Sequence, residues 1–136
     1  MSLPALAEIR EEYDLVEAED RYRLLIDLGE QLEPMPDALK TDATKVRGCS
    51  ASVWVYPTED NGRLTFLADS NAAITKGIVA LVLTAVQGKP AAEIAAMDIA
   101  GCLEPFALSK HLSANRTQGV PNMIALIRDT ASRYAA

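Results

Sequence analysis

The chain has 136 residues with a net charge of −6, and 49% of them are hydrophobic and 24% charged. This is the composition of a folded domain, and it excludes a disordered or collagen-like chain. The acidic balance opposes nucleic-acid phosphates. The most apolar run, Gly77 to Val86, is too short to span a bilayer, and the N-terminus lacks the basic start of a secretion signal. We therefore expect one cytoplasmic domain over residues 1–136 that binds neither nucleic acid nor membrane.

Residues 4–32 have the apolar spacing of an amphipathic helix or of two helices in succession. Between Glu17 and Leu32, apolar side chains such as Leu25 and Leu28 recur three or four positions apart. Gly29 and the prolines that follow at 34 and 36 are typical helix stop signals. Residues 33–48 are polar and form an unusually long loop, a feature that often carries function or moves.

The next segment predicts a β-hairpin. Residues 52–58 are rich in β-branched and aromatic side chains, and residues 63–68 alternate apolar Leu64, Phe66 and Ala68 with other side chains. Asn61-Gly62 between the two runs is a strong signal for a tight hairpin turn.

The remaining chain predicts helices. Asp69 or Ser70 can cap a helix over residues 71–87, which has almost no polar face and is expected at the centre of the core. Residues 90–97 and 103–108 are typical of short helices. A last helix begins between Thr117 and Pro121, with the proline in its first turn or at a kink. We expect an α+β fold in which a small antiparallel sheet of two or three strands packs against several helices.

Cys49 stands where the long polar loop meets the first strand. Gly48 lets the backbone turn or come close to another group. Lys45 and Arg47 place positive charge beside the thiol, which favours the nucleophilic thiolate. A cysteine at this position also fits a small buried hydrophobic side chain, and spacing alone does not separate the two interpretations.

Three further residues are candidates for chemistry. Cys102 has an apolar, helical context, so we expect packing rather than a role as a resolving thiol. His111, the single histidine, could act as a base for Cys49 or could simply end a helix. Arg116 precedes the last helix, where it and the helix amides would attract an anion, unless it is an ordinary solvated arginine. The spacing of these cysteines and this histidine predicts no metal site.

Three blocks of sequence resemble one known family. Residues 32–54, which contain Gly48-Cys49-Ser50-Ala51-Ser52-Val53-Trp54, are similar to the signature of the SufE family of sulfur acceptors, as are residues 68–83 and 108–127. Residues 21–32 also fit that family's N-terminal helix. The blocks follow the family's order along nearly the whole chain.

The resemblance implies a function. A SufE-like protein takes persulfide sulfur from a pyridoxal-phosphate-dependent cysteine desulfurase of the SufS or CsdA kind, stimulates that enzyme, and delivers the sulfur to an iron–sulfur scaffold. The family's acceptor cysteine matches Cys49, and the resemblance also implies a SufE/IscU-like α+β fold. From the chemistry of persulfide transfer we expect no cofactor, and Arg116 and His111 as supporting residues that stabilise charge near Cys49. We expect a monomer or homodimer. Residues 40–51 are expected to form a mobile loop that shields the persulfide.

Other functions remain open at this stage. Cys49 with His111 as base would suit a hydrolase or peroxidase that acts without a partner. A non-catalytic adaptor would stimulate a desulfurase by binding alone. An iron–sulfur scaffold is disfavoured because clusters usually need more thiolates than two cysteines supply.

Overall fold

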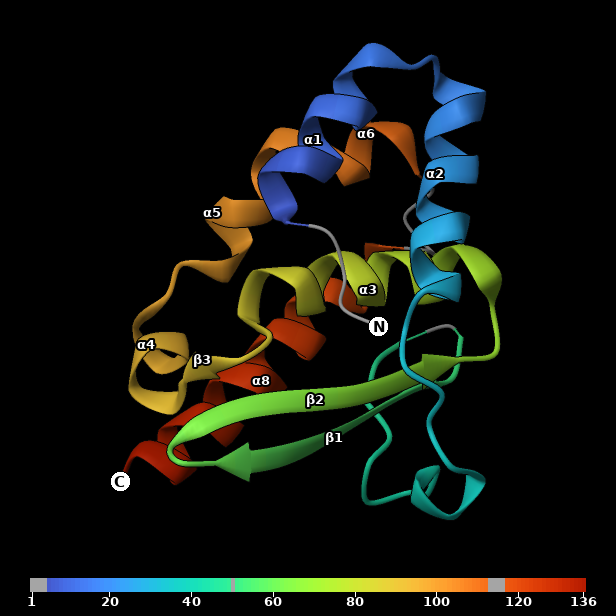
Figure 1. Cartoon of the computed structure of the whole chain (residues 1–136). Coiled ribbons are helices and arrows are strands. Elements are labelled where there is room, and N and C mark those ends of the chain that lie inside the picture. Colours follow the sequence, from blue (N-terminus) through green and yellow to red (C-terminus); the bar gives the residue numbers. More distant parts are fainter. Residues whose placement is uncertain (1–4, 50, 113–116) are drawn as a thin grey trace.

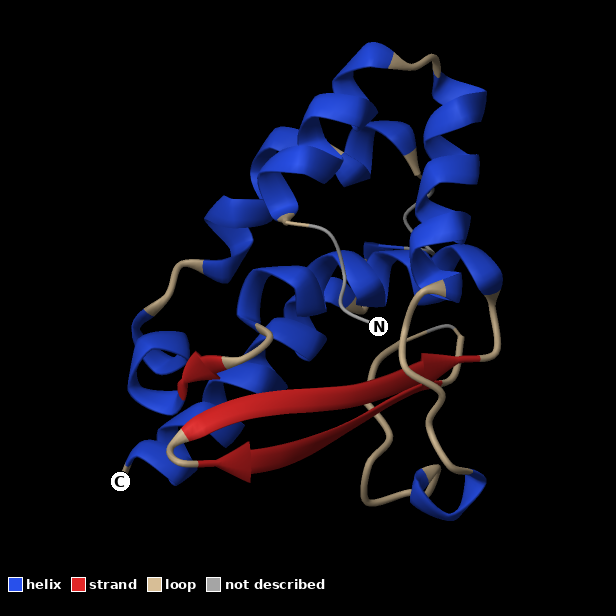
Figure 2. Cartoon of the chain, in the orientation of Figure 1, coloured by secondary structure: helices blue, strands red, loops and turns tan. Residues whose placement is uncertain are grey.

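The computed structural model describes residues 5–49, 51–112 and 117–136, and its helices gather on one side of a small sheet (Figures 1 and 2). The described elements, in chain order, are α1 (Leu6–Leu15), α2 (Ala18–Glu30), the 3-10 turn η1 (Asp37–Leu39), β1 (Val53–Asp60), β2 (Arg63–Ser70), α3 (Ala73–Val86), β3 (Lys89–Pro90), α4 (Ala91–Ala96), α5 (Ile99–Leu103), the 3-10 turn η2 (Glu104–Phe106), α6 (Leu108–His111) and α8 (Val120–Ala135). The predicted α+β class is confirmed.

The sheet is antiparallel, with strand order β1-β2-β3. The predicted hairpin turn is confirmed, because Asn61 and Gly62 both have positive φ, 53° and 80°, as a two-residue turn between twisted strands requires. Val53 and Val55 on β1, with Leu64, Phe66 and Ala68 on β2, face the helices and are buried. The predicted alternation of Leu64, Phe66 and Ala68 along β2 is therefore confirmed.

Helix α3 lies at the centre of the core, as its composition predicts. Its residues from Gly77 to Leu83 are all buried, as are Ala85 and Val86. Each large apolar side chain buried in this way stabilises the fold by roughly 1.5–3 kcal/mol. The predicted side-chain cap of α3 is wrong: the capping position is Ala72, without a side-chain hydrogen bond. Ser70 Oγ instead accepts from the Ala72 amide at 3.3 Å.

Helix α2 ends at Glu30, one residue after Gly29 and before the two prolines, as the stop signals predict. Gly29 lies in the last turn of α2 and is buried against α3. A Cβ on Gly29 would lie 2.8 Å from the amide nitrogen of Gly77, and a Cβ on Gly77 would overlap the carbonyl oxygen of Leu25. The two glycines thus let α2 and α3 cross with their backbones nearly in contact.

The helices after α3 are shorter and more often interrupted than the sequence predicts. The helix predicted over residues 103–108 is instead the end of α5, the turn η2 and the start of α6. Ala107 explains the break, because its φ of 48° is left-handed and no α-helix continues through it. The last helix, α8, begins at Val120 with Pro121 in its first turn, as one of the two predicted alternatives has it. Among the described residues, no helix is long and apolar enough to cross a membrane.

The close crossing of α2 and α3 makes a prediction about stability. Gly77→Ala forces the helices apart and should lower the free energy of unfolding by about 1–3 kcal/mol, the usual cost of overpacking. Urea denaturation measures this change. Asp27→Ala, on the exposed side of α2, is the control and should stay within about 0.5 kcal/mol of the wild type. An unchanged urea midpoint for Gly77→Ala would contradict the close approach of α2 and α3 at this glycine.

Candidate functional site

The long loop between α2 and β1 returns to the sheet just before Cys49. The Val46 amide donates to the Val53 carbonyl at 2.8 Å, and the Val55 amide donates to the Thr44 carbonyl at 2.9 Å. Lys45 and Trp54 therefore form a short antiparallel bridge on the outer edge of β1. Val46 itself is buried in the core. These contacts anchor the N-terminal side of the turn that carries Cys49.

An ion cluster holds the earlier part of the same loop. Lys40 Nζ lies 2.6 Å from Asp69 Oδ2, and Lys76 Nζ lies 3.3 Å from Asp69 Oδ1. Lys40 also sits over the ring of Trp54, 5.8 Å from its centroid. Burial alone would raise the pKa of Asp69, but the bonds from Lys40, the Ser70 amide and Lys76 hold that pKa below its ordinary value. The cluster joins the loop to the end of β2 and the start of α3.

A pair of hydrogen bonds holds the chain on the other side of Cys49. The Ser52 amide donates to Asn71 Oδ1 at 3.1 Å, and the Asn71 amide donates to the Ser52 carbonyl at 3.3 Å. Asn71 lies between β2 and α3. The turn that bears the thiol is thus held at Val46 before it and at Ser52 after it.

Cys49 packs against the beginning of α8. Gly48 has a φ of +82°, and a Cβ there would overlap the side chain of Asn122 in the first turn of that helix. A Cβ on Gly119, the residue just before α8, would overlap Cys49 Sγ. The thiol is free and half-buried, and it contacts the hydrophobic core. Two segments far apart in the sequence therefore meet at this sulfur.

The electrostatic surroundings of Cys49 differ from the sequence prediction. Lys45 and Arg47 are exposed, and burial raises the pKa of the Cys49 thiol. The sequence predicts that these two basic residues favour the thiolate, whereas desolvation of the sulfur acts in the opposite direction and water screens exposed charges.

The other sequence candidates are placed as follows. Cys102 lies in α5, packs against the core, and lines a small cavity beside Leu6 and Arg10 of α1. This position fits the expected packing role, and both thiols are free. Arg116 lies outside the described residues, and so does the side chain of His111, so their proposed roles stay predictions.

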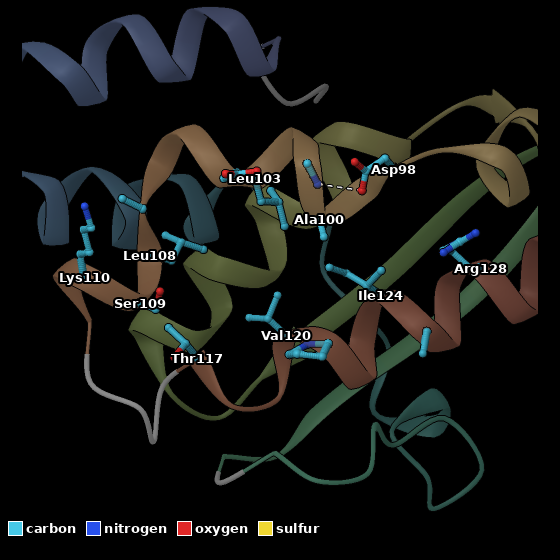
Figure 3. A pocket seen from close by; sticks show the side chains of 15 residues that line it. Asp98, Ala100, Leu103, Leu108, Ser109, Lys110, Thr117, Val120, Ile124 and Arg128 are labelled. Atoms are coloured by element: carbon cyan, nitrogen blue, oxygen red, sulfur yellow. Dashed lines mark hydrogen bonds between the residues drawn. The ribbon is translucent and has the colours of Figure 1, made fainter.

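A groove of about 930 Å³ lies on the other side of the first turn of α8, between that helix and the segment from α5 to α6 (Figure 3). Its middle is formed by Leu103, Val120 and Ile124, with Asp98 and Arg128 toward one end. The Asp98 carboxylate accepts from the Gly101 amide at 3.0 Å and so caps α5. Cys49 does not line this groove. Within the described parts of the chain, no group of acidic, histidine or cysteine side chains could hold a metal ion.

Sequence reasoning found Cys49 and Gly48 but missed the residues that surround them. Gly119, Asn122, Asn71 and the Lys40–Asp69 pair carry no motif that points to a thiol. A glycine directly before a helix usually serves as a cap, so Gly119 has an ordinary local explanation. Only the contact with Cys49 assigns it to the site.

The ion cluster predicts an acid-dependent loss of stability. Because the folded pKa of Asp69 lies below its unfolded value, the stabilisation is complete above about pH 4 and is lost as pH falls through the folded pKa. Asp69→Asn should therefore be less stable than the wild type at pH 7, and the gap should close in acid. Urea midpoints across pH measure it, with exposed Asp42→Asn as the control. A constant gap at all pH values would contradict this account.

The burial of Cys49 predicts a slow thiol at neutral pH. Its alkylation by iodoacetamide should reach half of its maximal rate at a pH above that of the same cysteine in the urea-unfolded chain, because burial disfavours the thiolate. Peptide mass mapping measures the rate at Cys49 separately from Cys102. If the alkylation rate of the folded protein reached half of its maximum at a lower pH than that of the unfolded chain, the charges of Lys45 and Arg47 would outweigh the effect of burial on the thiol.

Comparisons with known proteins confirm the resemblance of the sequence blocks. The chain is 43% identical to the sulfur acceptor protein CsdE of Escherichia coli K12 over 107 residues, which is 78% of this chain and 73% of that protein. It is 38% identical over 122 residues to an uncharacterized SufE-like protein of Rhizobium etli, covering 87% of this chain and 82% of that one. A further SufE-like protein, from Rhizobium meliloti, is 40% identical over 121 residues and 86% of each chain.

The fold also has a solved counterpart. The solution structure of a hypothetical protein from Thermus thermophilus has a TM-score of 0.77 at 15% identity, and the match covers 99% of this chain and 98% of that one. A family model described as "SufE: Fe-S metabolism associated domain" matches residues 7–131. The chain therefore belongs to the SufE family.

Proposed function

We propose that this protein is a sulfur acceptor that takes persulfide sulfur from a cysteine desulfurase onto Cys49 and serves iron–sulfur metabolism. The observation that carries the proposal is the placement of Cys49: a free, half-buried thiol at a turn held on both sides, in a chain of the SufE family. The sulfur acceptor CsdE is similar over most of the chain.

The transfer is a thiol exchange. The Cys49 thiolate attacks the outer sulfur of the donor persulfide, and a bond forms between Cys49 Sγ and that sulfur. The sulfur–sulfur bond within the donor breaks, and the donor cysteine leaves as a thiolate. The proton released by Cys49 balances the one that the leaving thiolate takes up, so the step needs no external oxidant or reductant.

The surroundings of Cys49 suit a carrier better than a stand-alone nucleophile. Burial raises the pKa of the resting thiol, so small electrophiles meet little thiolate. A partner that displaces the turn would return the thiol to water and restore its ordinary acidity. The anchors at Val46 and Ser52 confine such a movement to the residues between them. Of the loop expected to move, residues 40–51, only the part nearest Cys49 would therefore be displaced.

The partners follow from this role. The donor is a pyridoxal-phosphate-dependent cysteine desulfurase of the SufS or CsdA type, which this chain stimulates by removing its persulfide sulfur. The recipient is an iron–sulfur scaffold downstream. Arg116 and His111 are kept as supporting residues, and Arg116→Ala should slow the transfer if that arginine stabilises charge near Cys49. The protein acts as a monomer or homodimer without a cofactor of its own.

Intact mass spectrometry tests the proposal directly. After incubation with a SufS- or CsdA-type desulfurase and L-cysteine, the wild type should gain one or more sulfur atoms that reductant removes. Cys49→Ala should gain none, because the attacking sulfur is gone. Cys102→Ala is the matched control and should gain sulfur as the wild type does.

Three outcomes would overturn the proposal in different ways. Sulfur on Cys102 but not on Cys49 would assign the wrong thiol. Stimulation of the desulfurase by Cys49→Ala as strong as by the wild type, with no sulfur on either protein, would favour the non-catalytic adaptor. Turnover of an ester or peroxide that needs His111 and no partner would favour the stand-alone enzyme.

A further inference from the structure

The backbone at Gly119 does not itself require glycine. Its φ of −83° and ψ of −9° lie in the ordinary right-handed region, which any residue adopts. Glycine is required here because a side chain at position 119 would not fit. A Cβ at position 119 would overlap Cys49 Sγ and would lie 3.0 Å from Cys49 Cβ and 3.2 Å from Cys49 Cα. The three atoms nearest to that Cβ all belong to Cys49.

The two sides of this contact differ in how firmly they are held. Gly119 is buried, and its carbonyl accepts from the Met123 amide at 3.0 Å, as part of the first turn of α8. Met123 and Ile127 fix that helix in the core with 2% and 0% exposure. Cys49 lies in a turn whose nearest described anchors are Val46 and Ser52. A clash between the two would therefore move the turn before it moves the helix.

We propose that Gly119 is the positioning residue for Cys49. Because residue 119 has no side chain, it leaves a space, here called the seat, in which the Cys49 sulfur lies. The seat sets how easily an electrophile reaches that sulfur. This inference rests on the proposed function, in which Cys49 is the reacting thiol, and adds the residue that regulates its access. A side chain at 119 pushes the sulfur outward, toward water. The thiol then regains its ordinary acidity as well as its exposure, since burial is what disfavours its thiolate.

Alkylation of the free thiols tests this seat. Gly119→Ala should accelerate the reaction of Cys49 with iodoacetamide at neutral pH, on the order of tenfold for each pKa unit that the thiol regains. Cys102 in the same molecule is the internal reference, because it is also half-buried and free, and its rate should not change. Pro121→Ala, an exposed position in the same turn of α8, is the matched control.

A second measurement covers the case in which the variant folds poorly. Replacing Cys49 by alanine removes the sulfur that Gly119→Ala would overlap. The loss of stability caused by Gly119→Ala, measured by urea denaturation, should therefore be smaller in the Cys49→Ala background than in the wild type. Equal losses in both backgrounds would overturn the seat. An unchanged alkylation rate at Cys49, or an equal rise at both cysteines, would also overturn it.

The outcome is independent of sulfur transfer. Alkylation needs neither a desulfurase nor a persulfide, so an accelerated Cys49 in Gly119→Ala supports the seat even if the wild type accepts no sulfur. Sulfur uptake by the wild type with no effect of Gly119→Ala on alkylation leaves the proposed function in place and rejects the seat.

Discussion

Helix α3 carries almost no side chain that water can solvate favourably, so the rest of the chain must cover it from every side. The hairpin covers one side with the inward residues of β1 and β2, and α2 covers another. The crossing with α2 is close only because Gly29 and Gly77 lack side chains at the contact. The burial of this one helix is the main driving force for the arrangement of the other elements.

That arrangement also builds the candidate site. Because α3 follows β2 directly, Asp69 and Asn71 lie at the same end of the hairpin as the returning loop. Asp69 holds Lys40, and Asn71 holds Ser52. The loop before Cys49 and the strand after it are thus tied to the segment that leads into the core helix. The segment that leads into α3 therefore anchors the turn that bears the thiol, and the sulfur itself lies against Gly119 just before α8.

The chemistry of the thiol follows from a balance between charge and burial. Exposed basic side chains are screened by water, whereas desolvation acts on the sulfur itself. A half-buried cysteine with a raised pKa suits a protein that must remain unreactive until the proper donor arrives. The large groove beside α5 and α8 is lined by both apolar and charged side chains and does not include the thiol.

The sequence by itself determined most of the local elements and made Cys49 the candidate thiol. The Asn61-Gly62 turn, the alternation along the hairpin, the all-apolar α3 and the motif around Cys49 are each visible within a few residues, because neighbours in the chain share one face of an element. The burial that raises the pKa of the Cys49 thiol comes from distant segments, and the neighbouring Lys45 and Arg47 give no sign of it. Only the tertiary structure decided that Gly119 contacts the Cys49 sulfur and that Asp69 pairs with Lys40 of the long loop. Contacts between segments far apart in the chain produce no local periodicity in the sequence.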